Sequence, residues 1–181
     1  NKTNFKVFYT GSLFRWKGVH TLVDSLNYLP KNLELIFIGG SGQYLLDFKN
    51  YVAESSHSSR IKVIPHIPKK ELLKLIEKAD VFVLPNSARD KMSLFTSPIK
   101  LFEYMTSKRP IVASRLLSIE EILIDKKNAF LFDPDNAQDL AKKINLAISS
   151  DCTFLVNNAF KDVKAYTWDI RAEGIAKFIK R

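Results

Sequence analysis

Cysteine, histidine and long apolar runs are scarce in this chain of 181 residues. The single cysteine, Cys152, excludes a disulfide within the chain, and no cysteine or histidine spacing typical of a zinc site occurs. No apolar run approaches the ~20 residues that a membrane-spanning helix needs. We therefore expect a cytoplasmic protein without a structural metal site or a membrane span.

Acidic residues are also in short supply, with 19 Asp and Glu against 28 Lys and Arg, which gives a formal net charge of +9. Such a charge attracts nucleic acid, anionic phospholipid headgroups or a diphosphate-bearing ligand, or it reflects solvated lysines. Nucleic acid is disfavoured because no helix-turn-helix, zinc or aromatic-basic RNA motif accompanies the charge. The other three interpretations stay open.

Six apolar runs alternate with helical patterns, which is typical of a parallel sheet covered by helices on both faces. The run from Leu33 to Ile38 is nearly continuous, as in a strand buried on both faces. The length suits a single domain over residues 1–181. We predict an α/β fold, a Rossmann-like doubly wound parallel sheet of about six strands, with strands at 5–10, 33–38, 61–64, 81–84, 111–113 and 128–132.

A short helix is predicted immediately before the fifth strand. Ser97 has the chemistry of an N-cap, and Pro98 suits the first helical position. Lys100 and Glu103 lie one turn apart and therefore share a helix face. An anion could dock at the free N–H groups near Ile99, so this helix start would suit a nucleotide diphosphate and its ribose hydroxyls. The alternative is a solvated Lys–Glu pair on a surface helix.

Two glycine-containing loops follow the first two strands. Gly11 opens a loop that carries Arg15 and Lys17 and leads into a helix after Gly18. In doubly wound sheets ligands bind at such loops, so both cations are candidates for diphosphate contacts, with loop charges in water as the alternative. The glycine-rich turn at residues 39–42 could cradle a phosphate, but we interpret it as mainly a tight turn.

The string Ser-Pro-Ile-Lys-Leu-Phe-Glu-Tyr-Met, which begins at Ser97, resembles a family. It is similar to a recurrent form in retaining glycosyltransferases of the GT-B fold, family 4, also called glycosyl transferases group 1. Glu103 falls on the second glutamate of the Glu-x7-Glu signature of that family, and Phe95 stands where the first would be. Lys17-Gly18 resembles the end of the family's loop after the first strand. The resemblance covers nearly the whole chain and corresponds to the C-terminal, nucleotide-sugar-binding half of the fold.

The resemblance implies the donor-binding half of a retaining, metal-independent glycosyltransferase that uses a nucleoside-diphosphate sugar, with a UDP-sugar favoured and no cofactor. Lys17 would contact the diphosphate with Arg15 as a second cation, and Glu103 would bind the ribose. His66 and Ile67 would contact the base, although a lone loop histidine is more often incidental. The implied donor-binding set is Gly11, Arg15, Lys17, His66, Ile67, Thr96, Ser97, Pro98, Ile99, Lys100 and Glu103. No catalytic residue is assigned in this half.

The resemblance also implies partners. The acceptor would be a lipid-linked saccharide of surface polysaccharide biosynthesis, such as O-antigen or capsule. A separate N-terminal domain would hold this acceptor, in the cytoplasm at the anionic inner face of the plasma membrane. We expect this chain alone to bind the donor without turnover, under a polar loop at residues 88–96. The competing hypotheses are a non-catalytic nucleotide-binding regulatory α/β domain and a basic nucleic-acid-binding domain.

Overall fold

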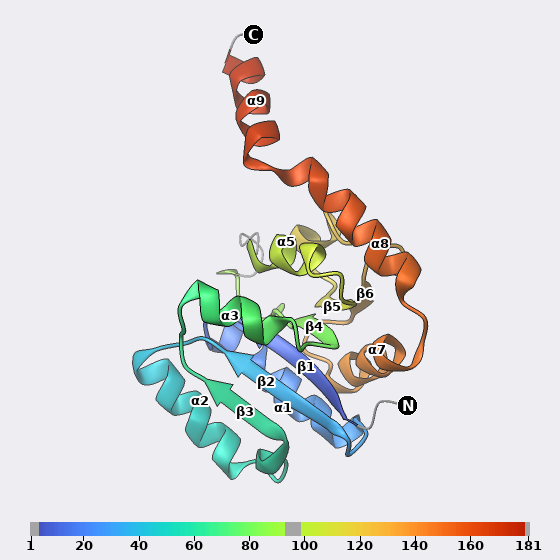
Figure 1. The fold of residues 1–181 in the computed structure, drawn as a ribbon. Coiled ribbons are helices and arrows are strands. Elements are labelled where there is room, and N and C mark those ends of the chain that lie inside the picture. Colours follow the sequence, from blue (N-terminus) through green and yellow to red (C-terminus); the bar gives the residue numbers. More distant parts are fainter. Residues whose placement is uncertain (1–3, 93–98, 180–181) are drawn as a thin grey trace.

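The computed structural model describes residues 4–92 and 99–179 (Figure 1). Its six strands form one sheet in which all neighbouring strands are parallel, as the sequence predicts. The strands are β1 (Phe5–Thr10), β2 (Leu33–Ile38), β3 (Ile61–Ile64), β4 (Val81–Leu84), β5 (Ile111–Ser114) and β6 (Phe130–Phe132). The first four have the predicted bounds, β5 is one residue longer, and β6 is shorter at its start.

The strand order is β3-β2-β1-β4-β5-β6, so the chain reverses its direction of growth between β1 and β4. This is the doubly wound Rossmann-like arrangement that the sequence predicts. In such sheets ligands bind outside the carboxyl ends of the strands, at the point where the order reverses. A ligand site is therefore expected at the carboxyl ends of the strands, near β1 and β4.

Helices cover both faces of this sheet (Figure 1). The α-helices are α1 (Val19–Asp24), α2 (Gly42–Glu54), α3 (Lys69–Ile76), α5 (Ile99–Thr106), α6 (Leu117–Glu120), α7 (Ala137–Ser149), α8 (Thr153–Asp162) and α9 (Trp168–Ile179). Short 3-10 helices lie at Arg15–Lys17, Ser25–Tyr28, Ser58–Arg60 and Val163–Tyr166.

The core is divided by the sheet into two apolar layers. One layer contains buried residues of α1, α2 and α7, and the other contains buried residues of α5 and α6 with part of α3 packed against it. Neighbouring strand residues alternate between them: Val81 and Val83 belong to the first layer, whereas Phe82 and Leu84 belong to the second. Burial on both faces explains why the strands are almost wholly apolar in sequence.

Two details concern the helices at the end of the chain. Asn136 caps α7, as its side chain accepts a hydrogen bond from the Asp139 N–H at 3.0 Å. The last helix, α9, extends away from the sheet (Figure 1), and Trp168 and Phe178 are each 78% exposed. Among the helices in residues 4–92 and 99–179, none is long and apolar enough to cross a membrane.

Candidate functional site

A cavity of about 330 Å³ lies at the carboxyl ends of β1, β2 and β3. We call it the strand-end cavity. Its lining comes from the loops after these three strands, from the first half of α2 and α3, and from α5. Four of the residues predicted from the sequence meet there, namely Gly11, His66, Ile67 and Lys100. Residues far apart in the chain are therefore brought to the edge where a doubly wound sheet binds its ligand.

Main-chain hydrogen bonds hold the three loops beside one another. The Gly11 N–H donates to the Ile38 carbonyl at 2.9 Å, and the Gly39 N–H donates to the Ile64 carbonyl at 2.9 Å. The His66 N–H then donates to the Gly40 carbonyl at 3.3 Å. Because these groups bond to one another, the floor of the cavity is fixed before any ligand enters.

Gly39 allows the loops after β1 and β2 to approach closely. Its φ is +132°, and a Cβ atom there would lie 2.2 Å from the Gly11 carbonyl oxygen. Only glycine fits such a position. The tight-turn interpretation of residues 39–42 is therefore confirmed, and Gly39, Gly40 and Ser41 of that turn also line the cavity. Contact with a phosphate remains a prediction.

Tyr104 fastens α5 to the end of β1. Its hydroxyl oxygen accepts a hydrogen bond from the Thr10 N–H at 2.8 Å and lies 3.0 Å from Thr10 Oγ1. The tyrosine ring stacks on Phe82, with ring centroids 4.4 Å apart. Burial raises the pKa of Tyr104 well above its usual value, so the phenol keeps its proton. This anchor fixes Lys100, one turn earlier on the same helix, at the cavity.

Lys100 and Glu103 share a helix face, as predicted, and form an ion pair with Nζ 2.7 Å from Oε2. Their side chains are 33% and 45% exposed, so the pair is partly solvated. Lys100 lines the strand-end cavity, whereas Glu103 is not part of its lining among the described residues. The predicted ribose contact of Glu103 therefore stays a prediction, and so does the alternative of a solvated Lys–Glu pair on a surface helix.

Ile99 begins α5 and is 69% exposed. The predicted Thr96, Ser97 and Pro98 lie outside the described residues, as does part of the predicted loop at 88–96.

The other two predicted cations lie beside the strand-end cavity, in the 3-10 turn after β1. Lys17 Nζ is 3.9 Å from the centre of the Trp16 ring, and burial lowers the pKa of this lysine. Gly18 follows in the left-handed conformation with φ +70°, and a Cβ there would lie 1.7 Å from the Pro85 carbonyl oxygen. The Lys-Gly pair thus has a structural reason for its glycine that is independent of any ligand.

Arg15 faces a different space, which we call the α1–α2 hollow. It has a volume of about 410 Å³ and lies between α1, α2 and the loops after β4 and β6. The Tyr51 hydroxyl donates to Asp24 at 2.6 Å there. His20 also lines the hollow, and its buried Nδ1 has no hydrogen-bond partner among the described residues. Burial and, secondly, the charge of Arg15 lower the pKa of His20.

Asp133 and Asp135 have an Asp-x-Asp spacing, which is a metal-binding motif in other sugar transferases. Their surroundings therefore bear on the expected absence of a metal site. Asp135 Oδ2 accepts a hydrogen bond from the Ala88 N–H at 3.0 Å and lies 3.9 Å from Arg89 Nε. This carboxylate joins the loops after β4 and β6. Among residues 4–92 and 99–179, no group of three or more His, Cys, Asp or Glu is arranged to hold a metal ion.

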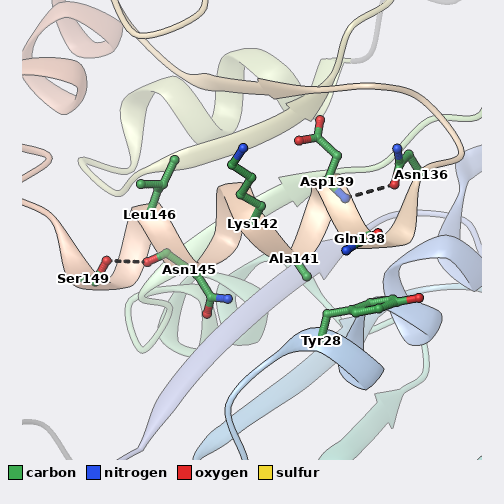
Figure 2. Close-up of a pocket in the computed structure, with 9 residues that line it drawn as sticks. All are labelled: Tyr28, Asn136, Gln138, Asp139, Ala141, Lys142, Asn145, Leu146 and Ser149. Atoms are coloured by element: carbon green, nitrogen blue, oxygen red, sulfur yellow. Dashed lines mark hydrogen bonds between the residues drawn. The ribbon is translucent and has the colours of Figure 1, made fainter.

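A larger space of about 710 Å³, the α7 hollow, lies along α7 and beside Tyr28 (Figure 2). Figure 2 shows Gln138 and Ala141 on the side of α7 that faces Tyr28, with Lys142 and Leu146 on the opposite side. The hollow is larger than the strand-end cavity, but nearly all its lining comes from one surface helix. Its lining contains none of the donor-binding residues predicted from the sequence. We therefore favour the strand-end cavity as the candidate site.

Two aromatic residues at the strand-end cavity are not predicted from the sequence. Phe14 and Tyr44 both line it, and their ring centroids are 4.6 Å apart. Each belongs to a segment whose local pattern predicts only a loop or a helix start. Their meeting depends on the close approach of the loops after β1 and β2, which composition and spacing do not reveal.

Residues 1–162 match the family model of glycosyl transferases group 1. An uncharacterized glycosyltransferase of Methanocaldococcus jannaschii is 26% identical over 176 residues, which cover 96% of this chain and 47% of the relative. The amylovoran biosynthesis glycosyltransferase AmsK of Erwinia amylovora is 26% identical over 139 residues, covering 75% of this chain and 34% of AmsK.

Solved structures show the same fold. The crystal structure of Anabaena HepE in complex with UDP and glucose superposes with a TM-score of 0.82 at 22% identity, covering 98% of this chain and 48% of HepE. This similarity agrees with the sheet order and with the GT-B domain predicted from the sequence. The chain spans about half the length, or less, of the curated relatives that it matches.

Proposed function

This chain belongs to the glycosyl transferases group 1 family, and on that premise we propose that it is the donor-binding domain of a glycosyltransferase. The donor is a nucleoside-diphosphate sugar, and the strand-end cavity receives it. The observation that carries the proposal is the convergence of Gly11, His66, Ile67 and Lys100 on one cavity at the carboxyl ends of β1, β2 and β3.

The chemistry that such a site must serve is departure of a nucleoside diphosphate from the anomeric carbon. Negative charge develops on the leaving phosphate, and preorganised cations and N–H groups stabilise it. Lys100 offers a charge at the cavity, held in place through Tyr104. We assign Lys17, Arg15, Ser97, Pro98 and Ile99 to the same task. Reaction with retention of configuration and without a metal ion completes the proposal.

Glu103 is proposed to accept hydrogen bonds from the ribose hydroxyls. Its Oε2 lies 2.7 Å from Lys100 Nζ. The two residues of this ion pair would therefore bind neighbouring parts of the donor, Glu103 the ribose and Lys100 the diphosphate. His66 and Ile67 are proposed to meet the base, from the loop after β3. We assign no catalytic residue in this chain, and the residues that face the acceptor belong to a separate N-terminal domain.

UDP is our favoured nucleotide. The support is the fold similarity to Anabaena HepE, whose structure contains UDP. We further propose a lipid-linked saccharide acceptor in surface polysaccharide biosynthesis, with the enzyme at the cytoplasmic face of the plasma membrane. Similarity to AmsK, named for amylovoran biosynthesis, supports the polysaccharide role. The net charge of +9 would favour contact with an anionic membrane.

A thermal-shift series with UDP, GDP and ADP tests the proposal on this chain. A ligand that binds only the folded state stabilises it by about 2.7 kcal/mol at a hundred times its Kd. We expect a clear rise in Tm with UDP and a smaller one with GDP or ADP. A shift with GDP alone would overturn the base assignment. No shift with any nucleotide, combined with strong salt-sensitive DNA binding, would favour a nucleic-acid-binding domain instead.

A further inference from the structure

The aromatic pair at the strand-end cavity has no part in the contacts assigned so far. Phe14 directly precedes the 3-10 turn after β1, and Tyr44 lies in the first turn of α2. Their ring planes are at 88°, with centroids 4.6 Å apart, which is an edge-to-face contact. Phe14 is in turn nearly parallel to Trp16, with centroids 6.1 Å apart and an angle of 11°. The Tyr44 ring therefore contacts Phe14, which in turn lies beside Trp16.

The contact with Phe14 leaves at least one face of the Tyr44 ring uncovered by that partner. In an edge-to-face pair at most one face of either ring is covered by the partner. The Tyr44 residue is 58% exposed although it lines the cavity. A large aromatic group that is braced on one side and open on the other is suited to receive a flat ligand group.

The cavity has an apolar part and a cationic part. Ile67 and Leu72 line it from the β3 side, while Lys100 lines it from α5, which is tied to the end of β1. Neighbouring strands are about 4.8 Å apart, so the ends of β3 and β1 are separated by roughly 10 Å. A nucleoside diphosphate has the same polarity, with a flat base at one end and anionic phosphates at the other.

We propose that Tyr44, braced by Phe14, is the surface on which the nucleobase of the donor stacks. This inference rests on the proposed function, in which the cavity receives a nucleoside-diphosphate sugar. Stacking uses the ring face and not the pattern of hydrogen-bond donors and acceptors, so Tyr44 adds affinity for any base. Choice between bases is then left to the loop after β3. The Tyr44 hydroxyl is not needed for this contact.

Isothermal titration with UDP tests the assignment on the parent chain, Tyr44→Ala and Tyr44→Phe. Loss of a base–aromatic contact is expected to weaken UDP binding about 5- to 150-fold in Tyr44→Ala. Tyr44→Phe keeps the ring and should bind within about twofold of the parent. The matched control is Tyr28→Ala, which removes another exposed tyrosine, 53% exposed and at the α7 hollow, and should leave the UDP affinity unchanged.

A fluorescence measurement separates stacking from a merely structural role. UDP should quench the added tryptophan in Tyr44→Trp, after subtraction of the parent signal, and should not quench that in Tyr28→Trp. The inference is overturned if the parent binds UDP while Tyr44→Ala binds it equally well, or if Tyr44→Phe loses as much affinity as Tyr44→Ala. Failure of the parent to bind UDP, GDP or ADP would instead overturn the proposed function itself, and the stacking role with it.

Discussion

The strand-end cavity and the α1–α2 hollow lie on either side of the same short turn, Arg15–Lys17, yet their charges are arranged differently. The hollow contains two arginines, Arg15 and Arg89, together with three carboxylates, Asp24, Asp90 and Asp135. The strand-end cavity has Lys100 in its lining and, among the described residues, no carboxylate. The cation of the cavity thus pairs with Glu103, which lies outside the lining, whereas the hollow has cations and carboxylates together in its lining.

This difference shows that the net charge of +9 does not locate a ligand. The total charge attracts anions to the surface as a whole, whereas the local balance decides where they stay. Arg15 was predicted to contact the donor because it lies in the right loop. Arg15 lines the hollow and not the strand-end cavity, whereas Lys100 lines the cavity.

The largest expected effect on the free energy of unfolding comes from Gly39→Ala, which crowds the main chain at the floor of the strand-end cavity. Gly39→Ala introduces a Cβ 2.2 Å from the Gly11 carbonyl oxygen at a φ of +132°, and we expect a loss of roughly 3–5 kcal/mol in the free energy of unfolding. Gly42→Ala is the control, because its φ is +56° but no atom lies within 4 Å of the new Cβ. It should cost about 1–2 kcal/mol. Urea denaturation measures both, and equal losses would show that the loop contact is not tight.

Lys100→Ala should weaken UDP binding by about 1–3 kcal/mol, the range for hydrogen bonds to charged groups. The same range is expected for Lys17→Ala. Neither change should alter stability much, because the Lys100 side chain is partly solvated and Lys17 contacts mainly Trp16. Lys142→Ala in the α7 hollow serves as the control for the loss of one positive charge. If both test variants bind UDP like the parent, the phosphates bind elsewhere.

Glu103→Gln removes the charge and keeps the shape. An amide retains only part of the hydrogen bonding to a ribose diol, so UDP binding should weaken by about 1–2 kcal/mol. A 2′-deoxy UDP should show a similar deficit with the parent and little further loss with the variant. Fully additive losses would return Glu103 to the role of a surface partner of Lys100.

The smallest expected effect is the pH dependence of stability that His20 contributes from the α1–α2 hollow. Burial lowers the pKa of His20 below 6.5 in the folded chain, with Arg15 adding to the decrease and Asp24 opposing it. The unfolded chain then binds more protons just below pH 6.5, so stability should fall as the pH drops through that region. Unfolding free energies between pH 5 and 8 should show a shallower slope for His20→Gln. Equal slopes in the parent and in His20→Gln would contradict the assignment.

The fold was predictable because its signals are local. The run from Leu33 to Ile38 is apolar since β2 is buried on both faces, and its bounds match the prediction. The spacing of Lys100 and Glu103 also determined their shared face. The sequence could not show that Phe14 meets Tyr44, because that contact depends on main-chain bonds between separate loops.

Amide chemical-shift mapping during a UDP titration tests whether a nucleoside diphosphate binds in the strand-end cavity. The amides of Gly11, Gly39, Gly40, His66 and Lys100 should shift together with one affinity. Amides of Asp24, Tyr51 and α7 should stay in place. Shifts confined to α7 or to the α1–α2 hollow, or no shifts at saturating UDP, would contradict binding in the strand-end cavity.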